Sequence, residues 1–181
     1  MATKILYGPH ISKTESDVMA RKCFYSFHYK LDNWRVQTIK NIGSIEEQPL
    51  LGSNKWEEIK KGGNAAIQKW IDDQMKGKSC VIVLVGSETA GRKWVNYEIK
   101  KGWGDGKGVL GVHIHNLLDR NLNKSVKGND PFSGFTVQDK PLSNWAKCYD
   151  PPASDSKKVY EHISSNIESW VEEAIRLRNS L

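Results

Sequence analysis

The stretch SCVIVLVGS at residues 79–87 constrains the fold more than any other part of the chain. Its core, CVIVLV, is a continuous apolar run rich in β-branched side chains, and serine and glycine stand beside it. A strand with one face in water alternates apolar with polar residues, whereas this run has no polar position. The pattern is typical of a strand that is covered on both faces, as in a parallel sheet.

The rest of the chain predicts further strands that alternate with helices. Apolar, β-branched or aromatic runs predict strands at 21–29, 48–53 and 108–116. Helical spacing predicts helices at 32–43, at 55–77 in two pieces broken near Gly62-Gly63, at 92–102 and at 154–180. We therefore expect an α/β fold with a doubly wound parallel sheet of four to five strands flanked by helices.

One domain accounts for most of this length. Residues 1–20 are polar and weakly patterned, so we interpret them as an N-terminal arm, and we assign 21–181 to the domain. Within it, residues 117–153 read as a loop-rich insertion because they hold four of the six prolines. The helix at 154–180 then closes the chain.

The composition suits a folded protein inside the cell. Hydrophobic residues make up 38% and charged residues 27%, and no stretch approaches the roughly 18 apolar residues of a transmembrane helix. The N-terminus lacks the apolar run of a secretory signal. Three widely spaced cysteines, Cys23, Cys80 and Cys148, indicate reduced thiols rather than a disulfide framework or a zinc site. We expect a cytoplasmic location and no association with membranes.

The net charge of +6 favours anionic partners such as nucleotides, nucleic acid or an acidic protein. The lysines are scattered in pairs, such as Lys60-Lys61 and Lys100-Lys101, and form no long basic tract. Such pairs usually cover a soluble surface. Charge alone is therefore a weak argument for nucleic-acid binding.

Glu98 falls inside the apolar arc of the predicted helix at 92–102. On a helical projection Trp94, Val95 and Ile99 share one face with Tyr97 at its flank, and Glu98 lies between Trp94 and Val95. A lone helical glutamate usually reaches solvent or pairs with a lysine, since burying an unpaired charge costs several kcal/mol. The aromatic, apolar surroundings make a functional carboxylate the alternative that needs testing.

The predicted fold places this carboxylate near a ligand crevice. In doubly wound sheets ligands bind beyond the carboxyl ends of the strands. The residues that follow the predicted strands are 26–28, 53–56 and 86–89. Because the helix with Glu98 leaves the third of these strands, we expect its side chain under the crevice, beside Trp94 one turn earlier.

A single carboxylate suits only some reactions. Most hydrolysis uses both an acid and a base. One carboxylate suffices when the leaving group is cationic and needs no proton, as with the nicotinamide of NAD⁺, because it can stabilise the oxocarbenium-like ribose that remains. A nearby indole can stack on a ring. Backbone amides around Gly86-Ser87, before the helix, can hold phosphate.

Motifs of other classes are absent or weak. Neither GxGxxG nor GxxxxGK[ST] occurs, and GWGDGKG at 102–108 predicts a turn. His113 and His115 share a strand face, but no cysteine or acidic residue accompanies them at ligand spacing, so we expect no metal site. Ser87 lacks the GxSxG context of a nucleophile. A phosphoacceptor receiver is disfavoured because VGS and SFHY stand where its aspartates would be.

Four motifs carry a resemblance to a known family. FYSFHY (24–29), the tryptophan of NKWEE (54–58), VIVLVGSET (81–89) and RKWVNYEI (92–99) resemble, in order and spacing, the TIR-like protein of Thoeris anti-phage defence systems, of the ThsB type. The resemblance covers about residues 21–116. It implies a flavodoxin-like TIR fold for the domain at 21–181.

The resemblance also implies a reaction and a site. It implies cleavage of NAD⁺ at the nicotinamide–ribose bond, with cyclisation to an ADP-ribose isomer that acts as a signal. NAD⁺ is then the substrate, and no cofactor is expected. The family's catalytic glutamate falls on Glu98. The side chains implied as the pocket lining are those of Phe27, His28, Trp56, Ser87 and Trp94.

Several partners and alternatives stay open. The resemblance implies a companion effector reached through the nucleotide signal, and it makes a phage protein a candidate trigger and a homo-oligomer a candidate assembly. The first alternative is a catalytically silent TIR-like scaffold for sensing or assembly. The second, a nucleic-acid-binding domain, rests only on the net charge.

Overall fold

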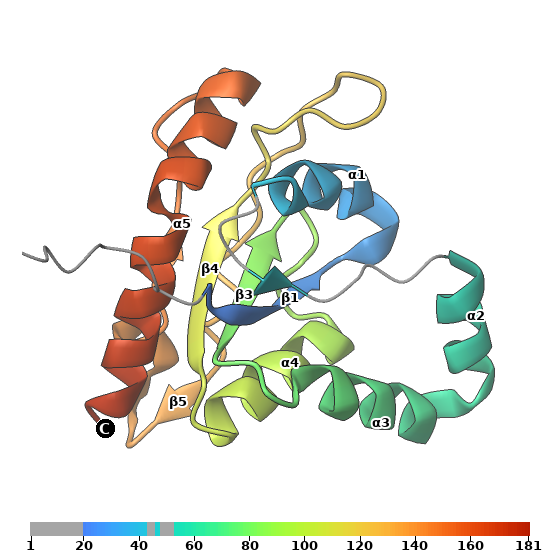
Figure 1. The fold of residues 1–181 in the computed structure, drawn as a ribbon, viewed down its shortest axis with the longest axis vertical. Coiled ribbons are helices and arrows are strands. Elements are labelled where there is room, and N and C mark those ends of the chain that lie inside the picture. The colour runs from blue at the N-terminus through green and yellow to red at the C-terminus, as the bar shows by residue number, and fades with distance from the viewer. Residues whose placement is uncertain (1–19, 43–45, 48–52) are drawn as a thin grey trace, which may run out of the picture.

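Five parallel strands form the central sheet of the computed structural model, which describes residues 20–42, 46–47 and 53–181 (Figure 1). Their order across the sheet is β2-β1-β3-β4-β7. The strands are β1 (Lys22–Phe27), β2 (Glu46–Glu47), β3 (Cys80–Val85), β4 (Gly108–His113) and β7 (Cys148–Tyr149). The order reverses direction between β1 and β3, which is the switch point of a doubly wound fold.

Helices cover both faces of this sheet. The first face is packed by α1 (Tyr29–Lys40) and α5 (Ser156–Asn179), and the second by α3 (Gly63–Met75) and α4 (Lys93–Gly104). In Figure 1, α5 stands to the left of the strands, and α3 and α4 lie below them. A further helix, α2 (Ser53–Lys61), precedes α3. Gly63 separates α2 from α3 with φ of +73°, a left-handed conformation that glycine adopts without strain.

The central strands account for most of the core. Every residue of β3 and of β4 is buried, as expected of strands with a helical layer on each side. Alternate side chains go to opposite layers: Val81, Val83 and Val85 pack towards α3 and α4, whereas Ile82 and Leu84 pack towards α1 and α5. The continuous apolar run therefore fills two separate cores.

Residues 117–153 contain more structure than their loop-like composition indicates. A small hairpin joins β5 (Thr136–Val137) to β6 (Lys140–Pro141), and a 3₁₀ turn, η1, spans Leu142–Asn144. Phe132 and Leu142 are buried in the core on the α3 and α4 side. Strand β7 then adds the fifth strand to the sheet through Gly111↔Cys148 and Val112↔Tyr149. The segment thus completes both the sheet and one core.

The sequence predictions hold for most elements. The α/β class, the doubly wound parallel sheet and the helix break near Gly62-Gly63 are confirmed. The first helix begins at Tyr29 rather than at residue 32. The strand predicted at 48–53 lies largely outside the described residues, and β2 is found at Glu46–Glu47. The predicted arm at 1–20 also lies outside the description, apart from residue 20.

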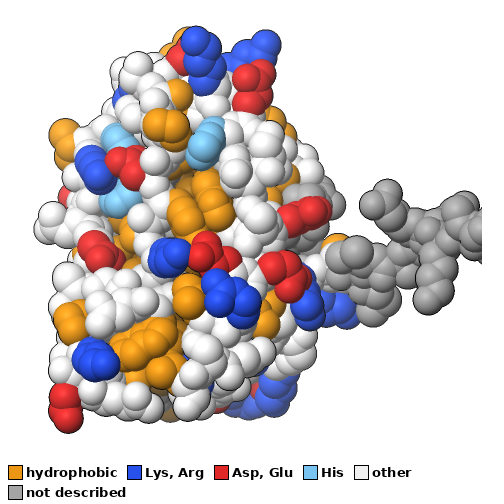
Figure 2. Space-filling view, turned by 90° about the vertical axis from the view of Figure 1, so that its left-hand side faces the viewer, with side chains coloured by type: hydrophobic (Ala, Val, Ile, Leu, Met, Phe, Trp, Pro, Cys, Tyr) orange, Lys and Arg blue, Asp and Glu red, His pale blue; other side chains and the backbone are white. Residues whose placement is uncertain are grey.

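The surface mixes charges of both signs. Figure 2, which views the side that lies on the left of Figure 1, shows lysine and arginine interspersed with aspartate and glutamate, with small apolar patches between them. Ion pairs on α5, such as Arg21–Glu172 and Lys147–Glu173, are part of this pattern. Among the described residues, no helix is long and apolar enough to cross a membrane.

Candidate functional site

Unpartnered polar atoms gather at the carboxyl edge of the sheet. In the described part of the chain, six buried side-chain atoms have no hydrogen-bond partner. All belong to residues at or just beyond the ends of β1 and β4, or packed against them: His28, Asp32, Asn33, His113, His115 and Ser125. Such atoms are normally satisfied by ordered water or a ligand. This edge is therefore the place to look for a binding site.

Glu98 is buried on α4 and held by one hydroxyl. The buried face of α4 consists of Val95, Glu98, Ile99 and Gly102, as the apolar arc predicts. The side chain of Ser26, on β1, donates a hydrogen bond to Glu98 Oε2 over 2.5 Å. Glu98 is 8% exposed and Ser26 is 1% exposed. The carboxylate thus lies between α4 and the end of β1, next to the switch point.

Burial changes the acidity of this carboxyl. Removal from water raises the pKa of Glu98 to about 8, and the hydrogen bond from Ser26 acts in the opposite direction. No described residue donates to Oε1, and Oε1 is not among the sealed, unpartnered atoms. One oxygen of the carboxylate is therefore held by the protein, and the other is left for a ligand or water.

The strand alternation separates Ser26 from Phe27. Ser26 points to the α4 face, whereas Phe27 packs against the core on the α1 and α5 side. The ring of Phe27 lies 6.2 Å from that of Tyr29. Of the residues expected around Glu98, Phe27 is thus on the opposite face of the sheet. It can reach a ligand only beyond the strand end.

His28 and Ser87 lie at the ends of the two strands that flank the switch point. His28 immediately precedes α1 and makes no side-chain cap to it, and Ser87 follows β3. Burial, and then the positive charge of Arg92, lower the pKa of His28, so its imidazole is neutral near pH 7. Both side chains are half-buried. Both therefore lie at the carboxyl edge of the sheet, beyond the ends of β1 and β3.

Aromatic side chains pack on the Glu98 side of the sheet. Trp56 and Trp94 are partly buried against the α3 and α4 core. Trp94 lies edge-on to Tyr97 at 6.0 Å, and Trp56 lies edge-on to Trp70 at 5.9 Å. The structure thus places both predicted tryptophans on the same face as Glu98.

A buried ion pair lies beside the switch point and was not predicted from the sequence. Asp32 and Arg35, one turn apart on α1, are joined at 3.3 Å with almost no exposure. Arg35 also donates to the carbonyls of Leu117 and Asn123, which fastens the segment after β4 to α1. The spacing of DNWR, with opposite charges three residues apart, was the available signal.

Gly86 provides the room for this ion pair. A Cβ on Gly86 would lie 2.1 Å from Asp32 Oδ2. A Cβ on Gly128 would in turn lie 2.0 Å from the Gly86 carbonyl oxygen. Two glycines therefore let α1, the end of β3 and the segment after β4 approach one another closely.

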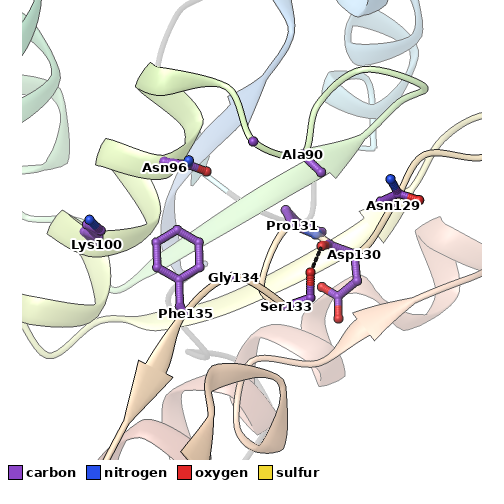
Figure 3. A pocket seen from close by; sticks show the side chains of 10 residues that line it. Ala90, Asn96, Lys100, Asn129, Asp130, Pro131, Ser133, Gly134 and Phe135 are labelled. Atoms are coloured by element: carbon purple, nitrogen blue, oxygen red, sulfur yellow. Dashed lines mark hydrogen bonds between the residues drawn. The ribbon is translucent and has the colours of Figure 1, made fainter.

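A pocket of about 380 Å³ lies between α4 and the segment 129–135 (Figure 3). In this view Asn96 lies above the ring of Phe135 and Lys100 lies to its left, both on α4, and Lys100 Nζ is 5.8 Å from the ring centroid. Asp130 and Ser133 form its lower wall. None of the residues predicted for the site, Glu98 included, lines this pocket.

Two histidines lie close together on β4 and just beyond it. His113 and His115 have rings 5.8 Å apart, and burial lowers the pKa of each. Within the described ranges, no three His, Cys, Asp or Glu side chains are grouped so that they could hold a metal ion.

Comparison with known proteins identifies the family. A protein-family model described as "Thoeris protein ThsB, TIR-like domain" matches residues 24–119, which is more than half of the chain. The chain belongs to the Thoeris ThsB TIR-like family. The matched range runs from β1 to just beyond β4 and includes Ser26, Arg35 and Glu98. The resemblance inferred from the four motifs is thereby confirmed.

One curated relative shares this ThsB type. It is a protein of Bacillus cereus (strain MSX-D12) named "Putative cyclic ADP-D-ribose synthase ThsB1", 33% identical over 125 residues. The alignment covers 66% of this chain and 65% of the relative. The chain thus spans slightly less than two thirds of the curated relative that it matches.

Proposed function

We propose that this chain is a TIR enzyme of bacterial anti-phage defence that cleaves NAD⁺ at the nicotinamide–ribose bond. In this proposal it converts the remainder into a cyclic ADP-ribose isomer, which activates a companion effector. The observation that carries the proposal is the Glu98 carboxylate, buried at the switch point of a ThsB TIR-like domain, with one oxygen that has no donor among the described residues. The name of the B. cereus relative supports the same substrate and product class.

The chemistry needs only one carboxylate. Nicotinamide leaves with the electron pair of the C–N bond and becomes neutral, so no acid has to protonate it. The ribose carbon becomes electron-deficient, and the negative charge of ionised Glu98 stabilises it. In the cyclisation step a hydroxyl or ring nitrogen of the same molecule bonds to that carbon. A proton released by an attacking hydroxyl can pass to Glu98, whose pKa of about 8 suits a base.

The surroundings of Glu98 favour an internal nucleophile over water. The carboxylate is 8% exposed, and Trp56 and Trp94 line the same face of the sheet. Limited water access and a positioned ribose or base are what cyclisation requires. The substrate is itself the nucleotide, so no cofactor takes part. The proposal also places the protein in the cytoplasm, because NAD⁺ and the effector would meet it there.

Mass spectrometry of the products tests this proposal. Concentrated protein is mixed with NAD⁺, and Glu98→Gln is run beside the wild type with Glu168→Gln, an exposed position on α5, as the matched control. The proposal expects nicotinamide and a cyclic isomer of ADP-ribose from the wild type and the control, and neither from Glu98→Gln.

The same assay distinguishes the proposed enzyme from the alternative of a catalytically silent scaffold. If purified protein gives no product, the assay is repeated on extracts of phage-infected cells, where a phage protein could act as the trigger. Product absent from both would favour a sensing or assembly role. Linear ADP-ribose in place of the cyclic isomer would retain NAD⁺ cleavage and remove the cyclisation step.

A further inference from the structure

Ser26 is a polar residue in an apolar environment. Its neighbours on that face of the sheet are Phe24 on its own strand and Val83, its partner across β1 and β3. A hydroxyl buried among such side chains destabilises the fold unless it is hydrogen-bonded. Among the described residues its one partner is Glu98 Oε2. An alanine side chain would suit the packing at this position equally well. The role of the hydroxyl is therefore its hydrogen bond to Glu98.

The Ser26–Glu98 hydrogen bond determines which oxygen of the Glu98 carboxylate is available to a ligand. Ser26 is fixed by the register of a strand inside the sheet, and α4 carries Glu98 to it across a sequence separation of 72 residues. A hydrogen bond from a rigid strand restricts the rotation of the carboxyl group. It directs Oε2 to the protein and leaves Oε1 without a donor from the described chain.

We propose that Ser26 is a positioning residue that holds the Glu98 carboxylate by Oε2 and presents Oε1 to the ribose of the nucleotide. This inference rests on the proposed function for its catalytic part. Its structural part, that the Ser26 hydroxyl stabilises the ionised form of Glu98, holds independently of any reaction. The two parts are therefore tested by separate measurements.

The hydroxyl affects protonation because it donates to a charged acceptor. Hydrogen bonds to the charged form of an acid favour ionisation, and within the described part of the chain burial is the cause that opposes it here. Other charged and titratable groups on the elements around Glu98 have partners of their own. Tyr97 donates a hydrogen bond to Asp72 on α3, and Lys101 pairs with Asp105. Burial lowers the pKa of His28, so its imidazole is neutral. Removal of the hydroxyl therefore leaves burial unopposed.

The first test titrates Glu98 without substrate. Carboxyl groups are followed by carbon NMR in protein labelled with ¹³C-glutamate, and the Glu98 signal is assigned by its loss in Glu98→Gln. Ser26→Ala should raise the pKa of Glu98 by about one pH unit, a tenfold change in its ionisation equilibrium. Ser26→Thr, which keeps the hydroxyl, should leave that pKa near the wild-type value. Ser79→Ala serves as the control, since the Ser79 hydroxyl donates to the Lys22 carbonyl at the other end of the strands.

The second test measures kcat/KM for NAD⁺ against pH in the same variants. Ser26→Ala should lower kcat/KM at pH 7 by about tenfold, with recovery towards alkaline pH as Glu98 ionises. A purely structural role for Ser26 would lower activity equally at every pH and would not be rescued by threonine. An unchanged Glu98 titration in a folded Ser26→Ala protein would overturn the inference, whether or not NAD⁺ is the substrate. A shifted titration together with no NAD⁺ turnover in any variant, either purified or in extracts of phage-infected cells, would overturn the proposed function and keep the Ser26–Glu98 coupling.

Discussion

At the scale of single residues, the chain buries one carboxylate on the apolar face of α4, where a carboxylate destabilises the fold. Glu98 occupies a position on α4 that would otherwise be apolar, beside Val95 and Ile99. Burial raises its pKa to about 8, and the hydroxyl of Ser26 is the only direct compensation among the described residues. A group so poised is partly protonated near neutral pH, so protonation can control what it does.

The pKa of Glu98 predicts the pH dependence of turnover. The proposed reaction needs the ionised carboxylate, and kcat/KM reports the pKa of the free enzyme. Initial rates of nicotinamide release at low NAD⁺ should rise about tenfold per pH unit below pH 8 and level off above it. A profile that is flat between pH 6 and 9, or that falls across this range, would show that Glu98 does not control the rate in its ionised form.

At the scale of elements, the structure depends on close contacts at the carboxyl edge. Arg35 connects α1 to the segment after β4 through the carbonyls of Leu117 and Asn123, and it neutralises Asp32. Asp32 in turn occupies the space that Gly86 leaves open at the end of β3. Three elements at the carboxyl edge of the sheet therefore depend on one buried ion pair.

Removal of the Arg35 side chain tests this dependence. Arg35→Ala leaves the buried Asp32 carboxylate unpaired, so the free energy of unfolding should fall by about 3–5 kcal/mol in urea. Arg92→Ala is the matched control, because Arg92 pairs with Glu88 four residues away at an exposed position. Its effect should stay within about 1 kcal/mol. Equal effects of the two substitutions would show that the buried pair has no special role.

A methyl group at Gly86 tests the close approach itself. Gly86→Ala would place a Cβ 2.1 Å from Asp32 Oδ2, and Asp32 cannot move away easily because Arg35 holds it. We expect a loss of about 1–3 kcal/mol in the free energy of unfolding. At Gly104, on α4, a Cβ meets nothing within 4 Å, and Gly104→Ala should be neutral or stabilising. A tolerated Gly86→Ala would contradict the packing described here.

At the scale of the whole molecule, the titration of Glu98 is linked to stability. Its folded pKa of about 8 is above the ordinary value of 4.5, so the folded state binds more protons than the unfolded state between these pH values. Stability due to this group is therefore present at low pH and is lost as pH rises towards 8. Glu98→Gln removes the titration and with it this pH dependence.

Urea unfolding of wild type and Glu98→Gln at pH 7 and pH 8 measures that linkage. Between pH 7 and pH 8 the free energy of unfolding of the wild type should fall by about 1 kcal/mol more than that of Glu98→Gln. The neutral histidines His28, His113 and His115 act at lower pH, where the unfolded state gains protons first, and they are common to both proteins. Parallel pH dependence in the two proteins would show that Glu98 titrates normally.

The sequence predicts the large elements and misses the contacts between them. Long apolar runs such as CVIVLV identify strands because every position is buried, and the arc around Glu98 identifies a helix with an anomalous carboxylate. Strand β7 has two residues and pairs only with Gly111 and Val112, so no periodicity could reveal it. The Ser26–Glu98 contact depends on sheet register and on the placement of α4. The assignment of pocket-lining roles to Phe27, His28, Trp56, Ser87 and Trp94 remains a prediction.

The most direct test of the account is the release of nicotinamide from NAD⁺, followed by proton NMR for wild type, Glu98→Gln and Glu168→Gln under one set of conditions. Steady release is expected from the wild type and from Glu168→Gln, and none above background from Glu98→Gln with an unchanged fold. Release by Glu98→Gln at the wild-type rate would contradict the central claim, since the buried carboxylate would then take no part in the reaction.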